Sequence, residues 1–400
     1  MDSRLRGLIL ACLALALAAC EAGATTDDAA IGADSGASDA AADDGGTAWD
    51  AGSDASAPLD GGSAPRVTRV YAGLGNGEVV VYSLAPDTGV LTEESRTATG
   101  ENPSFISGSP DGAHLYVVHE NAREVATLEV TAGTGAVSVV DRDDTDGDGP
   151  THVATSPDGR FVMVANYSAG STALFPVLAD GTLGARIETE RPGMRAHQVV
   201  FDASSAVAYV PCLGSDLVAQ FEVSASGLTP LDPASVSFIG GTGPRHLALS
   251  VDERFAYVIH ELASAITVHP RSASGVLMPS TQRVSTLPEG DPRGNTTAEI
   301  LVHPGGQLVL GSNRGEDSIA IFGVQPDGTL RIVGHEPTRG RTPRSMALTP
   351  DGALLLVANQ GSRDIQVFRV EASTGELTHL AGLDTGASAT YVGVFEIRAE

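Results

Sequence analysis

Short β-prone runs recur along the chain after residue 66, and residues 79–82 (VVVY) and 319–322 (IAIF) are two of them. Their apolar positions follow the period of two that is typical of a strand with a buried face. No segment of this region shows the 3.6-residue periodicity of a helix. The pattern therefore predicts an all-β fold.

Glycine-containing turns divide these strands into units of similar length. The seven turns of the first kind end 46 to 53 residues apart, at Gly89, Gly135, Gly181, Gly227, Gly275, Gly328 and Gly375. A second turn, with the motif Ser-Pro-Asp-Gly or a degenerate form of it, occurs six times, at 109–112, 156–159, near 202, and at 250–253, 303–306 and 349–352. Seven equal units of short strands are typical of a β-propeller. We therefore predict a seven-bladed β-propeller over residues 66–400.

The second turn occurs once less often than the first, so one blade lacks an inner hairpin of its own. Residues 391–397 (YVGVFEI) form an alternating strand after the seventh turn. This strand can pair with residues 67–72 and so remove the open edges of the ring. We expect the C-terminal strand to close the propeller.

The first 65 residues have a different composition. Arg4 and Arg6 precede an apolar run that is too short to span a bilayer, and it closes as residues 17–20 (LAAC), similar to a bacterial lipobox. We expect residues 1–19 to be a lipoprotein signal peptide and Cys20 to carry the lipid, with a plain secretory signal as the alternative. Residues 20–65 then form a disordered linker, because residues 21–65 hold ten acidic side chains, no basic one and little apolar surface.

Charge and cysteine content exclude several classes of function. The net charge of −26 argues against nucleic-acid binding, and the complete absence of lysine excludes Schiff-base chemistry by that side chain. Cys212 has no disulfide partner if Cys12 is removed with the signal and Cys20 is acylated. We expect an exported monomer of the cell envelope that uses no cofactor and meets the membrane only through its lipid.

Polar residues stand where the innermost strands begin. These are Ser104, His152, His197, His246, Glu299 and Ser345, and fifteen or sixteen residues later come Glu120, Tyr167, Cys212, Glu261, Arg314 and Gln360. A strand, a tight turn and a returning strand bring both ends to one rim. We therefore predict that Glu261 lies beside His246, and Arg314 beside Glu299, at the mouth of the channel.

Arg245, Arg344 and Asn313 add to this rim, although neighbours such as Arg245 and His246 point to opposite faces of a regular strand. Propeller channels can be lined by polar groups that only hold water. Several arginine, glutamate and histidine side chains are costly to bring together, which favours a ligand site.

Other candidate sites have weaker patterns. Asp144, Asp146 and Asp148 alternate like the start of a calcium loop, but Pro150 follows and Thr155 stands in place of the closing glutamate. A solvated acidic loop is the favoured interpretation. The histidines lack metal-ligand spacing, no Gly-x-Ser-x-Gly elbow is present, and Cys212 beside His197 remains a minor alternative as a nucleophile.

Segments in order and at blade spacing resemble the seven-bladed propeller lactonase family, which includes cycloisomerase-type 6-phosphogluconolactonases and a fungal carboxymuconate-lactonising enzyme. They lie at residues 102–105 (NPSF), 164–167 (VANY), 243–246 (GPRH), 298–300 (AEI), 312–315 (SNRG) and 357–360 (VANQ). The resemblance implies an active site at His197, Arg245, Glu261 and Arg314. It also implies that the arginines hold an anion or the developing oxyanion, while Glu261 or His197 activates water.

From these patterns we expect a lactonase-like hydrolase that opens a small, unphosphorylated, sugar-derived lactone. The side chains expected to contact the substrate are His152, His246, Glu299, Asn313 and Arg344. The alternative is a non-catalytic, surface-anchored propeller that binds a small anionic ligand or a protein, since a fold does not fix a function. A purely structural scaffold in the envelope is a third, weaker possibility.

Overall fold

The computed structural model describes residues 65–289 and 294–400. The predicted signal peptide, the lipidated Cys20 and nearly all of the predicted linker lie outside these residues. Within them, no helix is long and apolar enough to cross a membrane.

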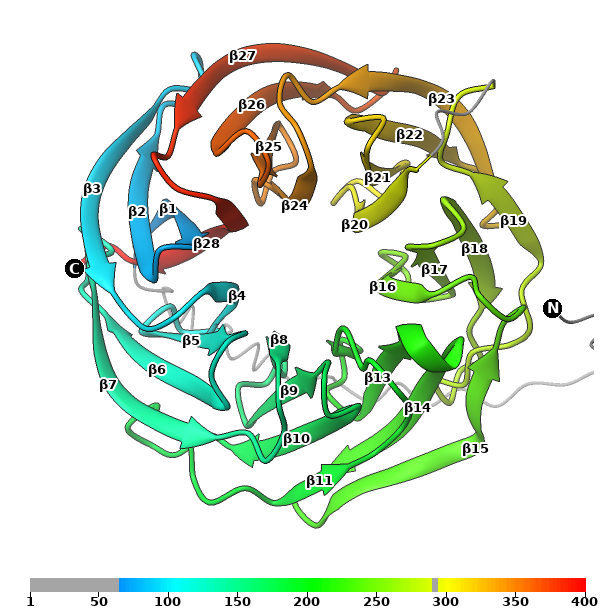
Figure 1. Cartoon of the computed structure of the whole chain (residues 1–400), viewed down its shortest axis with the longest axis horizontal. Coiled ribbons are helices and arrows are strands. Elements are labelled where there is room, and N and C mark those ends of the chain that lie inside the picture. Colours follow the sequence, from blue (N-terminus) through cyan, green and yellow to red (C-terminus); the bar gives the residue numbers. More distant parts are fainter. Residues whose placement is uncertain (1–64, 290–293) are drawn as a thin grey trace, which may run out of the picture. The chain divides into compact units, whose positions relative to one another are not determined.

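The described strands form seven four-stranded antiparallel sheets that stand in a ring (Figure 1). From the axis outward, the first three sheets contain β28 (Ala389–Arg398), β1 (Arg66–Leu74), β2 (Glu78–Leu84) and β3 (Leu91–Ala98); β4 (Pro103–Gly108), β5 (His114–His119), β6 (Glu124–Val130) and β7 (Val137–Asp144); β8 (Pro150–Thr155), β9 (Phe161–Asn166), β10 (Ser171–Pro176) and β11 (Glu188–Glu190). The fourth and fifth contain β12 (Val200–Phe201), β13 (Val207–Cys212), β14 (Leu217–Ser224) and β15 (Gly227–Ser237); β16 (Pro244–Leu249), β17 (Phe255–His260), β18 (Ala265–Pro270) and β19 (Gln282–Ser285). The last two contain β20 (Thr296–Val302), β21 (Leu308–Arg314), β22 (Ser318–Val324) and β23 (Leu330–Pro337); β24 (Pro343–Leu348), β25 (Leu354–Asn359), β26 (Asp364–Glu371) and β27 (Glu376–Asp384). The seven-bladed β-propeller is confirmed.

The middle strands of each blade are apolar on both faces because every sheet packs between two others. In β25, Leu354 and Leu356 pack toward the blade that holds β1 and β2, whereas Leu355 and Val357 pack toward the blade of β21 and β22. The core is therefore a series of layers between blades. A 3-10 turn, η1 (Leu213–Ser215), interrupts the β structure and was not predicted.

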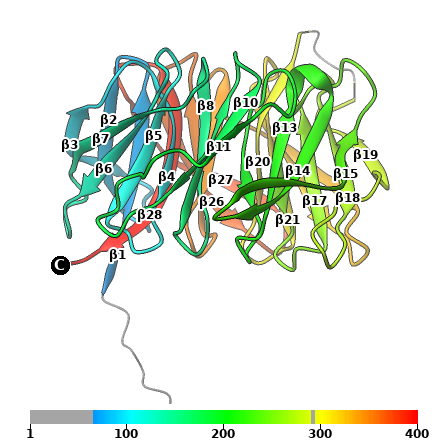
Figure 2. The same cartoon turned by 90° about the horizontal axis from the view of Figure 1, so that it is seen from below.

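Both ends of the described domain complete one blade, as predicted. Strand β28 pairs antiparallel with β1 from Arg66 opposite Arg398 to Gly73 opposite Tyr391. The Tyr391 hydroxyl donates to the Ile106 carbonyl of the next blade at 2.8 Å. The strands run between two rims of the ring (Figure 2). Residues near the start of the inner strands β16, β20 and β24 line one cavity, so these strands begin at the same rim.

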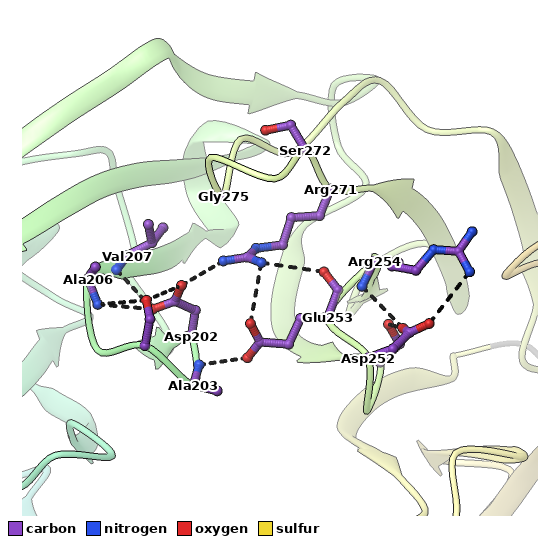
Figure 3. A network of polar contacts seen from close by, with 12 residues as sticks. Asp202, Ala203, Ala206, Val207, Asp252, Glu253, Arg254, Arg271, Ser272 and Gly275 are labelled. Atoms are coloured by element: carbon purple, nitrogen blue, oxygen red, sulfur yellow. Dashed lines mark hydrogen bonds and ion pairs between the residues drawn. The ribbon is translucent and has the colours of Figure 1, made fainter. Parts of the chain in front are cut away.

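The opposite rim carries a largely buried ionic network (Figure 3), in which Arg271, directly after β18, meets acidic side chains from turns between the inner two strands. Arg271 pairs with Asp202 at 2.7 Å and with Glu253 at 3.3 Å. Asp202 also accepts hydrogen bonds from the backbone of Ala206 and Val207. Because these residues belong to neighbouring blades, the network ties one blade to the next.

Candidate active site

A β-bulge at the start of an inner strand determines which side chains reach the axis. In β16 the register shifts between Pro244 and His246, so that Arg245 is an extra residue without a cross-strand partner. A bulge cancels the strict alternation of a strand. Arg245 and His246 therefore line the same cavity, although neighbours in a regular strand would point apart. Equivalent shifts occur in β4, β8, β20 and β24.

The predicted pairing of residues within each blade is wrong. His246 stands opposite Ile259, and the backbone N–H of Glu261 donates to the Gly243 carbonyl at 2.7 Å. Arg314 likewise stands opposite Thr296 instead of Glu299. A strand rises about 3.3 Å per residue, so this register separates the site into an outer layer with Glu261 and Arg314 and an inner layer with His246 and Glu299.

Glu261 is the centre of the outer layer. Its Oε2 lies 2.9 Å from Nη2 of Arg314 and 3.1 Å from Nε of Arg245. The guanidinium groups are further fixed by backbone carbonyls, since Arg314 donates to Thr297 and Arg245 to Ala298, each at 2.7 Å. Two arginines from adjacent blades are thus held around one carboxylate.

The inner layer consists of buried imidazoles and one carboxylate. Nδ1 of His246 lies 2.7 Å from Oε1 of Glu299, which comes from the next blade. The His197 ring meets the His246 ring edge to face at 5.1 Å between centroids, and His152 meets it at 5.7 Å. The backbone N–H of Val199 donates to Nδ1 of His152 at 3.4 Å.

Burial keeps the inner imidazoles neutral. It lowers the pKa of His152 and of His197 well below the usual value, and nearby Arg245 acts in the same direction. Burial also lowers the pKa of His246, although Glu299 opposes the change. The pKa of Arg245 falls to about 9 because of burial and the neighbouring arginines, against the pull of Glu261, and this side chain still carries its charge at neutral pH.

A narrow polar cavity lies among the imidazoles and has room for roughly one water molecule. Its lining comes from several blades and consists of Ser104, Phe105, Thr151, His197, Arg245, His246, Glu299, Arg344, Ser345 and Thr390. A sugar-sized ligand would have to bind above this cavity, beside the outer layer.

Two predicted contact residues have other partners. Arg344 lies on β24 and pairs with Glu120 at 3.3 Å, which links blades across the rim. Asn313 does not line the cavity. Its amide donates to the Thr286 carbonyl at 2.8 Å and to Ser318 at 3.2 Å, and its carbonyl accepts from the Thr286 hydroxyl at 2.8 Å. The prediction of Asn313 as a contact residue is not supported, because its hydrogen bonds join blades.

The weaker candidates are structural. Cys212 is buried in an apolar cluster, which raises the pKa of its thiol to about 12. A thiol of this kind is a poor nucleophile near neutral pH. Asp144, Asp146 and Asp148 face Arg123 at 3.5 to 4.0 Å. Within 65–289 and 294–400, no group of three or more His, Cys, Asp or Glu side chains has an arrangement that could hold a metal ion.

Sequence reasoning placed Ser104 at this rim without assigning it to the site, and it missed Thr390 beside the inner layer. Ser104 lines the cavity, and the Thr390 hydroxyl donates to the carbonyl oxygens of Gly73 and Pro103, each at 2.9 Å. Ser104 is the bulge residue of β4, and Arg245 and Arg344 are the bulge residues of β16 and β24. The recurrence of a polar residue at this position of the repeat was the signal that could have assigned Ser104 to the site.

Known proteins share this architecture. The chain is 32% identical over 173 residues to a 6-phosphogluconolactonase of Pectobacterium carotovorum, covering 43% of this chain and 52% of that protein. It is 30% identical over 229 residues to the enzyme of that name from Yersinia pestis, covering 57% and 68%. The chain thus spans about half the length of the first of these curated relatives.

The fold matches that of the periplasmic gluconolactonase of Pseudomonas aeruginosa with a TM-score of 0.77 and 29% identity, covering 83% of this chain and 99% of that one. The family model described as "Lactonase, 7-bladed beta-propeller" matches residues 69–393, which include every residue of the two layers. The chain therefore belongs to the seven-bladed β-propeller lactonase family.

Proposed function

We propose that this protein hydrolyses a small lactone at the site formed by His197, Arg245, Glu261 and Arg314. The observation that carries the proposal is the pair of arginines fixed around Glu261, directly above neutral imidazoles and a cavity of the size of a water molecule. Hydrolysis of a lactone needs stabilisation of an oxyanion and a base for water, and these two layers supply both.

In this proposal the lactone lies beside the outer layer, with its carbonyl oxygen toward Arg245 and Arg314. Their charge stabilises the tetrahedral oxyanion, and the planar guanidinium groups also suit a carboxylate on the substrate or product. Glu261 holds both guanidinium groups in position. The family resemblance assigns water activation to His197 or Glu261, and the lack of charge on the buried imidazoles favours the inner layer for that role.

A sugar-derived, unphosphorylated lactone is the favoured substrate. The proteins similar to this chain include 6-phosphogluconolactonases and a periplasmic gluconolactonase. A phosphorylated sugar lactone is a cytoplasmic metabolite, whereas the first twenty residues carry the pattern of an exported lipoprotein.

The experiment is titration of the acid released during ring opening by the purified full-length chain at constant neutral pH. We expect the protein to open gluconolactone faster than the spontaneous rate. The acceleration over the spontaneous rate should be larger for gluconolactone than for 6-phosphogluconolactone.

The second candidate function is a binding module, because the Arg–Glu cluster could also bind a small anion. Calorimetric binding of sugar lactones or acids without any acceleration would contradict hydrolysis and favour that candidate.

We also propose that Cys20 is the anchor. Diacylglyceryl and amide-linked chains together give stable attachment, whereas one acyl chain holds only marginally. Cys20→Ala should leave the precursor unprocessed or release the protein from the membrane fraction. The buried Cys212→Ala serves as the matched control and should fractionate normally; unchanged processing and fractionation of Cys20→Ala would contradict lipidation.

A further inference from the structure

The carboxylate of Glu299 has the geometry that prepares His246 for proton transfer. Nδ1 of His246 and Oε1 of Glu299 are 2.7 Å apart, and both residues are buried. An imidazole N–H donates to a carboxylate at such a distance, so a neutral ring carries its proton on Nδ1 and leaves Nε2 free. The carboxylate would also stabilise the imidazolium that forms when Nε2 takes a proton.

The cavity beside this pair suits a single water molecule. It is lined by His246 and Glu299 together with Ser104 and His197. Within the part of the chain that the structure describes, Oγ of Ser104 and Nδ1 of His197 are buried and lack a hydrogen-bond partner. A water in the cavity would satisfy polar atoms that are otherwise costly to bury.

We infer that His246, oriented by Glu299, is the general base that activates a water held in this cavity by Ser104 and His197. This inference rests on the proposed lactone hydrolysis and names a base other than the ones that the family resemblance implies. His197 then positions the water, because among the described residues its ring has no carboxylate partner comparable to Glu299.

The reaction balances without a further reactant. Nε2 of His246 takes one proton of the water as the oxygen bonds to the lactone carbonyl carbon, and the carbonyl oxygen becomes an oxyanion beside the arginines. When the ring C–O bond breaks, His246 returns that proton to the departing ring oxygen. Water and lactone thus give one hydroxy acid, and the imidazole is regenerated.

Charged and titratable groups surround His246 on every side that packs against it. Glu299 comes from β20, Arg344 from β24, His152 from β8, and His197 from the segment before β12, while Arg245 precedes His246 in β16. Burial lowers the pKa of His246 most, Glu299 raises it, and the arginines lower it further. Neutralising Glu299 therefore shifts the protonation of His246 toward lower pH.

The test compares Glu299→Gln, His246→Gln and His197→Gln in the full chain, by ring-opening rates over pH 4 to 8. We expect His246→Gln to reduce kcat by on the order of a hundredfold or more with little change in KM, the scale of a lost general base. In Glu299→Gln the acid limb of the kcat profile should move to lower pH while the plateau falls. A residue that only supports the fold would not move that limb.

The outcomes separate this inference from the proposed function. An active wild-type protein whose His246→Gln variant keeps full kcat, or whose Glu299→Gln profile keeps its acid limb, overturns the inference and leaves lactone hydrolysis standing. A wild-type protein without any turnover overturns hydrolysis itself. His379→Gln, on the exposed outer strand β27, is the matched control and should behave as wild type.

Nitrogen-15 NMR of the histidine rings gives a second readout that does not need activity or a variant that turns over. We expect the His246 ring to show a strongly deshielded Nδ1 proton that weakens or is lost in Glu299→Gln. The Nδ1 proton that His269 donates to the Met278 carbonyl should be unchanged and serves as the internal reference. A wild-type spectrum in which the His246 ring carries its proton on Nε2 would contradict the inference even if both variants fail to fold.

Discussion

Single residues at the bulges decide what this site contains. Because Arg245 is the extra residue of its strand, it reaches the same cavity as His246, and Arg344 and Ser345 repeat the arrangement in β24. The presence of these side chains at one rim could be predicted from their spacing. Their partners could not, because the bulge and the hairpin register set the pairing, and neither leaves a distinct mark in the residue types.

Asn313 shows how a residue next to the site can be structural. The equivalent Asn166 donates to the Thr145 carbonyl and to Ser171, each at 3.1 Å, so both asparagines fasten their blade to the end of the preceding one. We expect Asn313→Ala to lower the free energy of unfolding by about 1 to 3 kcal/mol, since buried partners lose their hydrogen bonds. Urea denaturation measures the loss. Asn166→Ala should cost less, because Oδ1 of Asn166 accepts no hydrogen bond from the described residues, whereas Oδ1 of Asn313 accepts from Thr286. A rise in KM for a lactone in Asn313→Ala alone would instead indicate contact with the substrate.

Elements of this fold are held in place by contacts between blades, and the Arg271 network is a largely buried ionic example (Figure 3). Arg271→Met should destabilise the protein by about 3 to 5 kcal/mol, because it leaves the Asp202 carboxylate buried without its cation. Arg254→Met is the control, since Arg254 is exposed and lies 3.7 Å from Asp252. It should change stability by about 0.5 kcal/mol or less. Equal unfolding midpoints for the two variants would contradict this assignment.

The whole molecule follows the repeat in its sequence closely. Turn spacing predicted seven blades, and the excess strand at residues 391–397 predicted closure of the ring, because propellers place one four-stranded unit per repeat. The separation of the site into two layers was not predictable, since it depends on which residue of each strand reaches a given height. The turn η1, formed by Leu213 to Ser215, lies in a segment with no helical periodicity.

Acid should destabilise the whole molecule through its buried histidines. Burial lowers the pKa of His119 to about 4 and that of His260 to about 3. The unfolded chain binds protons below about pH 6.5 while these folded imidazoles stay neutral, so their contribution to stability is complete above that pH and declines as pH falls toward 4. Each such histidine contributes a slope of up to ~1.4 kcal/mol per pH unit. Urea midpoints at pH 7.5, 6 and 5 measure this, and a constant midpoint would contradict it.

The central claim is that the two arginines around Glu261 stabilise charge during the opening of a lactone. Its most direct test is the turnover of gluconolactone by Arg314→Ala and Arg245→Ala, with the exposed Arg331→Ala of the same blade as Arg314 as the control. The account predicts that kcat falls on the order of a hundredfold or more in the two site variants, as for the loss of one oxyanion donor, and is unchanged in the control. Site variants that keep the wild-type kcat and differ only in KM would contradict it.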